Sequence, residues 1–396
     1  MQSSVVLDVT RLVSRLGRGA LTGIDRVELA YLQNLPSLCE NVFGLLRTPA
    51  GVLLLDRTGL HHLGEWSLGA TLPKHRDLLT RLIRKDAMLG AIETALRSIS
   101  IARLRVGALP HKLPELLGPF LYLNVGHSNL SAKMLKAIRS ARGHVVVMIH
   151  DVIPLDFPQF ARDGQHEVFA QKLRAVSQFS DAVIHLTEVG RSQTDHWFSL
   201  FGRVPRGIVA PLGVPVPRPD PVQVPSDLLI DQPYFIMVGT VEPRKNHEMI
   251  LQIWETLPEP VPQLFILGNR GWASDEVFRR LDAGQKNVHF RSGLGDGATA
   301  ALVQGARALL FPTFAEGFGL PPYEAAALGT PVIASDISVT REGLHDFPVY
   351  VSPTDSYSWR ETILAHCVEL SGTSIQKHPR QPPAWADHFK LVLSNL

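Results

Sequence analysis

The most informative stretch of the chain spans residues 311–324 and reads FPTFAEGFGLPPYE. It continues a short apolar run, as the end of a buried strand would, and its two prolines suit the first turn of a helix. Its glycines let backbone N–H groups approach a ligand, because glycine has no Cβ. A helix start with free amides favours an anion such as a phosphate. Glu316 and Glu324, with seven residues between them, could then hold hydroxyls at two ends of one ligand. The alternative is a proline-capped helix with a solvated glutamate.

Short apolar runs, each followed by a helical pattern, recur on both sides of this stretch. They cover residues 5–9, 120–125, 144–149, 182–186, 208–213, 234–239, 263–268, 287–290, 308–312, 331–335 and 349–351. The runs are apolar throughout rather than alternating, which is typical of parallel strands buried on both faces. This rhythm predicts two α/β domains with parallel sheets, whose ligands bind outside the carboxyl ends of the strands.

A proline-rich stretch separates the two sets of strands. Four prolines fall between residues 215 and 221, where neither a helix nor a central strand can continue. We therefore expect a first domain over residues 1–215, a linker over 216–230, a second domain over 231–370 and a C-terminal segment over 371–396.

Residues 74–112 are predicted to form a basic insertion in the first domain. They carry nine Lys or Arg against three acids, a net charge of +6. Apolar residues fall at helical spacings, namely Leu78, Leu79, Leu82, Ile83, Leu89, Ile92, Leu96 and Ile99. One interpretation is a surface that contacts anionic lipid at a membrane. The other is a pair of helices packed on the core with a solvated basic face.

Composition excludes several classes of protein. The chain has 396 residues, a net charge of +2, and two cysteines, Cys39 and Cys367. A disulfide scaffold, a cysteine-rich zinc module and a uniformly basic nucleic-acid-binding surface are therefore not expected. No apolar run reaches the roughly 18–20 residues of a membrane helix, and residues 1–4 do not resemble a signal peptide. These features predict a cytoplasmic protein.

Three other motifs also fall at predicted strand ends or before predicted helices. Arg244 and Lys245 follow the run that ends at Gly239, and two adjacent cations can neutralise a diphosphate, although such pairs are often solvated loop residues. His150 and Asp151 follow the run 144–149, where the histidine either polarises a substrate group or pairs with the aspartate. Gly23 opens a helix after residues 21–22, and His127 follows the run 120–125.

Together these motifs resemble the retaining glycosyltransferases of family four, which have the GT-B fold of two Rossmann-like domains facing across a cleft. The resemblance is strongest over residues 234–338 and 150–155. The family's pair of glutamates is similar to Glu316 and Glu324, and residues 325–335 and 268–272 also fit. Trp385 fits a last helix that, in this fold, returns to the first domain.

The resemblance implies roles for individual residues. His150, Glu316, Lys245 and Arg244 would be catalytic, with Glu316 contacting the donor sugar and the two cations stabilising the departing diphosphate. Glu324 would hold the ribose hydroxyls. The implied donor-binding set is Gly23, Gly239, Thr240, Arg244, Lys245, Leu294, Glu316, Gly317, Phe318, Gly319, Leu320 and Glu324. His127 and Asp151 are the expected acceptor-binding residues.

The phosphate-binding motif departs from the family pattern at Thr240, because many members carry an arginine there, and Arg244 is a candidate substitute. The chain has no Asp-x-Asp, so no metal site is expected and Arg, Lys and helix amides must stabilise the leaving group. Retention would follow from front-face attack, with the leaving phosphate accepting the acceptor's proton.

The sequence thus predicts a transferase that uses a nucleotide-sugar donor and no other cofactor. The His-Asp-x-Ile-Pro phrase resembles bacterial mannosyltransferases of polysaccharide assembly, which makes GDP-mannose the first candidate donor. A glycan or lipid-linked glycan is the expected acceptor, with the protein peripheral at the inner membrane face. The alternatives are a UDP-hexose or deoxysugar transferase, and a degenerate protein that binds glycan or acts as a scaffold. A nicotinamide-dependent epimerase or dehydrogenase is disfavoured, because residues 10–13 lack the glycine fingerprint after the first strand.

Overall fold

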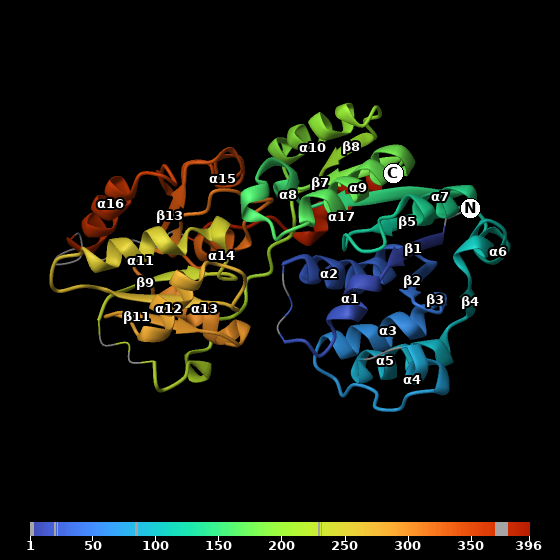
Figure 1. Cartoon of the computed structure of the whole chain (residues 1–396), viewed down its shortest axis with the longest axis horizontal. Helices are drawn as coiled ribbons and strands as arrows, with labels where there is room; N and C mark the ends of the chain where they lie inside the picture. Colours follow the sequence, from blue (N-terminus) through green and yellow to red (C-terminus); the bar gives the residue numbers. More distant parts are fainter. Residues whose placement is uncertain are drawn as a thin grey trace.

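The computed structural model describes residues 4–19, 21, 23–83, 86–228, 230, 232–368 and 379–396. Two α/β domains lie side by side, each built on one sheet with helices packed against it (Figure 1). None of the helices in these ranges is long and apolar enough to cross a membrane.

The N-terminal sheet has the strand order β4-β3-β2-β1-β5-β6-β7-β8. Its strands are β1 (Ser4–Asp8), β2 (Val42–Thr48), β3 (Gly51–Leu55), β4 (Ala102–Leu104), β5 (Phe120–Asn124), β6 (Gly143–Ile149), β7 (Ala182–His185) and β8 (Arg206–Val209). From β2 to β8 neighbouring strands are parallel, and every residue of β1 and β7 is buried. This confirms the prediction of parallel strands with both faces covered for β1 and β7, whereas β8, at the edge of the sheet, is only partly buried.

An antiparallel edge extends this sheet, which the sequence analysis did not predict. The β3 strand pairs antiparallel with both β2 and β4. A tight turn joins β2 to β3, and Gly51 adopts a φ of 144° there. Because β4 belongs to this edge, residues 74–112 are an integral part of the first sheet's domain rather than an appended insertion.

Helices of the N-terminal domain fill the connections between these strands. They are α1 (Thr10–Arg15), α2 (Gly23–Leu38), α3 (Arg57–Ser67), α4 (Leu78–Ile83), α5 (Ala87–Ile99), α6 (Leu109–Leu117), α7 (Ala132–Ser140), α8 (Ile153–Asp156), α9 (Gln165–Phe179) and α10 (Glu188–Leu200). Within residues 74–112, α5 buries Ile92 and Leu96 completely in the core, whereas α4 leaves its leucines in solvent. The interpretation as a helix packed on the core therefore holds for α5, whereas α4 is exposed to solvent.

The C-terminal sheet is parallel throughout, in the order β11-β10-β9-β12-β13-β14. Its strands are β9 (Tyr234–Val238), β10 (Gln263–Leu267), β11 (Val288–Arg291), β12 (Leu309–Phe311), β13 (Val332–Ser335) and β14 (Val349–Val351). Its helices are α11 (His247–Glu255), α12 (Asp275–Ala283), α13 (Asp296–Gly305), α14 (Leu320–Ala327), α15 (Ser338–Leu344) and α16 (Ser356–Val368). The order of strands reverses between β9 and β12, and ligands bind at such a switch point in open α/β sheets.

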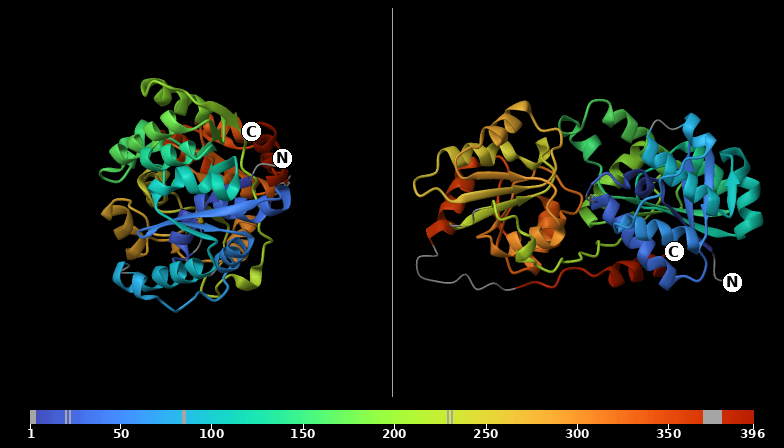
Figure 2. Two further views of the ribbon diagram at one scale, coloured as in Figure 1. Left: turned by 90° about the vertical axis from the view of Figure 1, so that its right-hand side faces the viewer. Right: turned by 90° about the horizontal axis from the view of Figure 1, so that it is seen from below.

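The chain passes between the domains twice. The first passage runs from β8 to β9, and the second leads from α16 to α17 (Trp385–Ser394), which packs on the N-terminal domain (Figure 2). On α17, His388 Nε2 shares a hydrogen bond of 2.7 Å with the hydroxyl of Tyr31 on α2. The ring of Phe389 is buried and contacts the ring of Tyr31. The two passages are tied together where the amide of Val214 donates to the carbonyl of Pro383 at 2.9 Å.

Candidate active site

The switch point of the C-terminal sheet brings together two adjacent cations and a carboxylate that lies 71 residues after the second of them. Arg244 and Lys245 lie in a 3₁₀ turn (Pro243–Lys245) that follows β9, and Glu316 lies in the loop after β12. Since β9 and β12 are neighbours, their carboxyl ends meet and so do these loops. The backbone amide of Phe314 donates to the Arg244 carbonyl at 2.8 Å, which holds the two loops together.

Glu316 is the centre of this cluster. Its Oε1 accepts from Lys245 Nζ at 2.5 Å and from Arg244 Nη1 at 2.7 Å, and its side chain is only 7% exposed. Arg244 also pairs through Nε with Glu242 at 2.6 Å and donates to the Ala315 carbonyl at 2.8 Å. The two cations are thus held in fixed positions by carboxylates within one domain.

Burial and pairing have opposite effects on the charges of this cluster. Burial disfavours the Glu316 carboxylate, but Arg244 and Lys245 outweigh it and lower its pKa to about 2. Burial lowers the pKa of Lys245, while Glu316 opposes that shift. Burial also raises the pKa of Glu242, against the attraction of Arg244. A carboxylate with so low a pKa as Glu316 is a poor proton acceptor near neutral pH and a good hydrogen-bond acceptor for hydroxyls.

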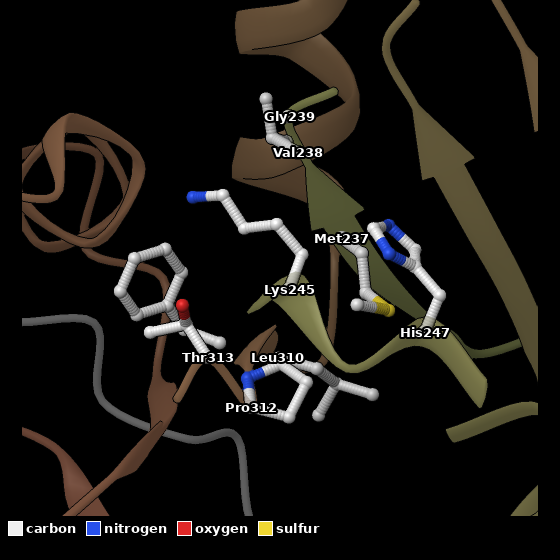
Figure 3. Close-up of a pocket in the computed structure, with 9 residues that line it drawn as sticks. Met237, Val238, Gly239, Lys245, His247, Leu310, Pro312 and Thr313 are labelled. Carbon is white, nitrogen blue, oxygen red and sulfur yellow. The ribbon is translucent and has the colours of Figure 1, made fainter. Parts of the chain in front are cut away.

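Lys245 reaches between the two strand ends. Figure 3 shows its side chain extending between Gly239, at the end of β9, and Thr313. The ammonium also lies 4.8 Å from the ring centre of Phe311. Gly239 has a φ of 143°, and behind it is a cavity of about 10 Å³, room for about one water. Thr240, from the implied donor set, lies next along this loop.

The glycine loop after Glu316 presents backbone amides rather than side chains. Phe318 is buried and stacks on Tyr323 at 4.6 Å between ring centres, so only its backbone faces the loop. Gly319 caps α14 with a φ of 83°. Because α14 has prolines in its first turn, and proline lacks an N–H, its free amides come from the residues up to Leu320.

The N-terminal domain contributes His150 and Asp151 directly opposite this loop. A Cβ added at Gly317 would lie 2.3 Å from the His150 carbonyl oxygen and 3.0 Å from the Asp151 Cβ. The two domains therefore touch where the sequence analysis placed catalytic and acceptor residues. The His150 amide donates to His127 Nε2 at 3.2 Å, which puts His127 behind His150. Burial lowers the pKa of His150 to about 4 and that of His127 well below its usual value.

A second contact between the domains surrounds Glu324, on α14. Arg26, on α2, pairs through Nη1 with Glu324 at 3.3 Å and through Nη2 with Asp296 at 2.7 Å. Gly23 begins the same helix and faces Leu320, whose Cδ1 would lie 3.8 Å from a Cβ at that glycine. Burial raises the pKa of Glu324, while Arg26 opposes that shift. Leu294 lies in the loop that leads to Asp296.

The C-terminal domain matches a known family model. Residues 225–364 match the model described as glycosyl transferases group 1, and this range contains the Glu316 cluster and Glu324. This part of the chain is a group 1 glycosyltransferase domain.

Curated proteins similar to this chain include bacterial mannosyltransferases. The serotype-specific mannosyltransferase WbdA of Escherichia coli is 29% identical over 289 residues, which is 66% of this chain and 34% of that protein. The O-antigen chain mannosyltransferase B of Escherichia coli is 32% identical over 143 residues, 35% of this chain and 36% of that protein. The chain thus spans about a third of the length of these curated relatives.

Solved structures match this chain over nearly its whole length. Anabaena HepE, in complex with UDP-glucose, covers 99% of this chain and 97% of its own, with a TM-score of 0.62 at 15% identity. Sucrose-phosphate synthase of Thermosynechococcus elongatus covers 99% and 94%, with a TM-score of 0.59 at 15% identity. The fold is GT-B, and the resemblance to family four is confirmed.

Sequence reasoning about the transferase missed the roles of Glu242, Arg26 and Asp296. Glu242 lies two residues before Arg244, and Arg26 lies three residues after Gly23, yet nothing local shows what they contact. Arg26 and Asp296 are 270 residues apart, so their pairing depends on how the domains meet. Among the described residues, no group of three or more His, Cys, Asp or Glu is placed to hold a metal ion.

Proposed function

We propose that the chain is a retaining glycosyltransferase that moves mannose from GDP-mannose to a glycan or lipid-linked glycan during synthesis of a cell-surface polysaccharide. The observation that carries the proposal is the buried cluster of Glu316, Arg244 and Lys245 at the switch point of a group 1 transferase domain. The choice of mannose rests on the mannosyltransferases among the relatives. The two free cysteines fit a reducing, cytoplasmic compartment.

In this proposal the C-terminal domain holds the donor and the N-terminal domain the acceptor. Arg244 and Lys245 bind the diphosphate, together with the amides near Gly319, while Glu316 and Glu324 hold sugar and ribose hydroxyls. His150 lies beside the reacting sugar, and His127 and Asp151 lie on the acceptor side. Two cations and a helix start supply the charge stabilisation that a metal ion would otherwise give.

The proposed reaction needs no carboxylate nucleophile. The bond between the anomeric carbon and the donor phosphate oxygen breaks as the acceptor oxygen forms its bond to the same face. The proton of the acceptor hydroxyl passes to the departing nucleoside diphosphate. The low pKa of Glu316, about 2, supports this assignment, because it makes that carboxylate a weak base.

The proposal is tested by donor binding followed by turnover. A panel of GDP, UDP, dTDP, ADP and NAD is screened by thermal shift with and without EDTA, since a ligand at 100 times its dissociation constant stabilises a protein by about 2.7 kcal/mol. GDP alone is expected to raise the melting temperature, with no effect of EDTA. GDP-mannose is then incubated with a synthetic lipid-linked glycan, and NMR reports the configuration of the product.

Other results of these experiments would point to a different donor, a different mechanism or a different function. A shift with UDP or dTDP alone would replace mannose by a hexose or deoxysugar from that donor. A shift that disappears in EDTA would overturn metal independence, and an inverted product would overturn retention. Binding without turnover on any acceptor would favour a scaffold or glycan-binding protein.

A further inference from the structure

The short helix α4 exposes an unusual amount of apolar surface. Leu78 and Leu82 are 77% and 84% exposed, and Leu79 and Ile83 are 41% and 38% exposed. Thr80 is the buried residue of this helix, and its hydroxyl lies 2.9 Å from that of Thr94 on α5. Four large apolar side chains in six residues are thus held toward solvent by a polar anchor. A contiguous apolar patch of this kind marks a surface that contacts a partner or a membrane.

A cavity of about 420 Å³ lies next to this helix, and two arginines are among the residues that line it. Its lining residues are Pro73, His75, Asp77, Thr94, Ala95, Arg97, Ser98 and Arg103. Arg97 is 7% exposed, and its Nη1 pairs with Asp77 at 2.5 Å. Its buried Nη2 has no hydrogen-bond partner among the described residues. A second arginine, Arg103, lines the same space and donates to the Arg97 carbonyl at 2.9 Å.

The charge around the patch decides what it can contact. Residues 74–112 carry a net charge of +6, while the whole chain carries +2, so the rest of the molecule is net acidic. Arg84 and Lys85 belong to this count but lie outside the described residues. Exposed leucines flanked by arginines bind the interface of an anionic bilayer, where the apolar side chains enter the acyl region and the cations meet phosphates.

We propose that α4, hereafter the docking helix, binds the surface of an anionic lipid bilayer and that the neighbouring arginine cavity receives a lipid phosphate. The leucines of the docking helix supply the apolar contact. Arg97 and Arg103 supply the donors for the phosphate group. The occupant is a phospholipid headgroup still attached to its bilayer.

The docking helix packs on α5, and α5 in turn contacts the segment that follows α1. Asp86, the N-cap of α5, pairs with Arg18 at 2.7 Å, in the loop between α1 and α2. In the same loop, a Cβ at Gly17 would lie 2.4 Å from the sulfur of Met88, so the two segments are in close contact. Figure 1 shows α4 and α5 together at one edge of the N-terminal domain. A docked bilayer would therefore lie on the side of the domain that carries Gly17 and Arg18. Its use in presenting a lipid-linked acceptor rests on the proposed function, but the docking itself does not.

Vesicle flotation of the full chain tests the proposal. Vesicles of phosphatidylcholine alone are compared, at the same total lipid, with vesicles that contain about 30% phosphatidylglycerol. We expect flotation with the anionic vesicles only, weakened by salt because the phosphate contacts are screened. The double variant Leu78→Ser/Leu82→Ser should lose at least tenfold in affinity with no change in melting temperature, since both side chains are already exposed. Arg103→Gln should lose affinity for anionic vesicles as well.

Control variants separate docking from effects on folding and on catalysis. Leu200→Ser, a change at a leucine 63% exposed on α10, should bind vesicles normally. Turnover on a water-soluble acceptor should be unchanged in Leu78→Ser/Leu82→Ser, so a failure of the proposed function would not be mistaken for a failure of docking. No flotation with any vesicle, equal binding to neutral vesicles, or a dimer in solution that Leu82→Ser abolishes would each overturn the proposal. If free inorganic phosphate binds in the cavity while the protein does not bind vesicles, the cavity is a site for a soluble anion. That result would also overturn the proposal.

Discussion

Glu316 and Glu324 stand at the two ends of one loop and helix, yet their surroundings are built differently. Glu316 pairs with Arg244 and Lys245, which belong to its own domain. Glu324 pairs with Arg26, which belongs to the other domain. The pKa of Glu316 falls to about 2, because its two cations outweigh burial, whereas burial raises the pKa of Glu324 despite Arg26.

The difference separates two kinds of site. The two ion pairs of Glu316 lie entirely within the C-terminal domain, although the charge of Asp151 from the N-terminal domain also acts on this cluster. The environment of Glu324 exists only while α2 and α14 face each other. The arrangement around Glu316 suits a group that, in the proposed function, holds the reacting sugar in one position. The arrangement around Glu324 suits a group whose ion pair forms only when the two domains are in contact.

The largest effect should come from removing the charge of Glu316. Glu316→Gln leaves Arg244 and Lys245 buried with one carboxylate fewer. It also removes the carboxylate that would accept hydrogen bonds from the sugar hydroxyls, so kcat/KM should fall about 10²–10³-fold. Sugar transfer measured with the proposed donor checks this. Glu361→Gln, a change at an exposed glutamate of α16, is the matched control and should be silent. Unchanged turnover in Glu316→Gln would contradict the assignment of the cluster to the donor.

The contact between the domains should be nearly as sensitive. Gly317→Ala places a methyl group 2.3 Å from the His150 carbonyl, so the domains cannot approach as closely. Turnover should fall by about 10²-fold, as misplacements of about 1 Å commonly cause, and small-angle scattering should show a larger radius of gyration. Gly107→Ala, a position with no atom within 4 Å of its added Cβ, should change neither quantity. Normal turnover in Gly317→Ala would mean that catalysis does not use this closed arrangement.

The pH profile should distinguish the two glutamates. Lowering the pH protonates Glu324 first, since burial raises its pKa, so kcat/KM should fall by up to about tenfold per pH unit below that pKa. Glu316 stays ionised until near pH 2, and His150, with a pKa of about 4, stays neutral above pH 5. Glu324→Gln should be slower and should lose this acid limb. A limb that persists in the variant would assign it to Asp151 or Glu242, whose pKa values burial also raises.

The smallest effect is expected at Arg26. Its side chain is 33% exposed, so solvent screens its pairs and Arg26→Met should cost about 1 kcal/mol or less. We expect about a fivefold change in apparent donor affinity, together with a weaker salt dependence than that of the native protein, because a screened ion pair has been removed. Isothermal titration at two salt concentrations measures both. A loss as large as that of Glu316→Gln would show that Arg26 binds the donor itself rather than holding the domains together.

Local sequence predicted the parts of the site but only some of their contacts. The end of a buried strand and the glycine loop around Gly317 are local features, so the amino-acid pattern alone assigns residues 311–324 to the site. The contact of Lys245 with Glu316 requires β9 to neighbour β12, which no local pattern specifies. The pairing of Arg26 with Asp296 requires the domains to meet and was missed.

The segment 74–112 shows the same limit in packing. Its apolar residues have helical spacing in α4 and in α5 alike. Ile92 and Leu96 are nevertheless fully buried, while Leu78 and Leu82 are exposed. Periodicity predicts that a helix has an apolar face but not what covers that face. The antiparallel pairing of β3 with β4 was also missed, because an edge strand of three residues has no pattern of its own.

The double passage of the chain between the domains limits how the molecule can open. A body held by one tether can swivel in any direction, whereas a body held by two adjacent tethers swings mainly about the line through them. The hydrogen bond from Val214 to Pro383 fixes the two tethers side by side at the N-terminal domain. We therefore expect any opening of the two domains to be close to a hinge rotation about a single axis. A rotation about this line would bring Gly317 back to the carbonyl of His150, the contact that the structure shows.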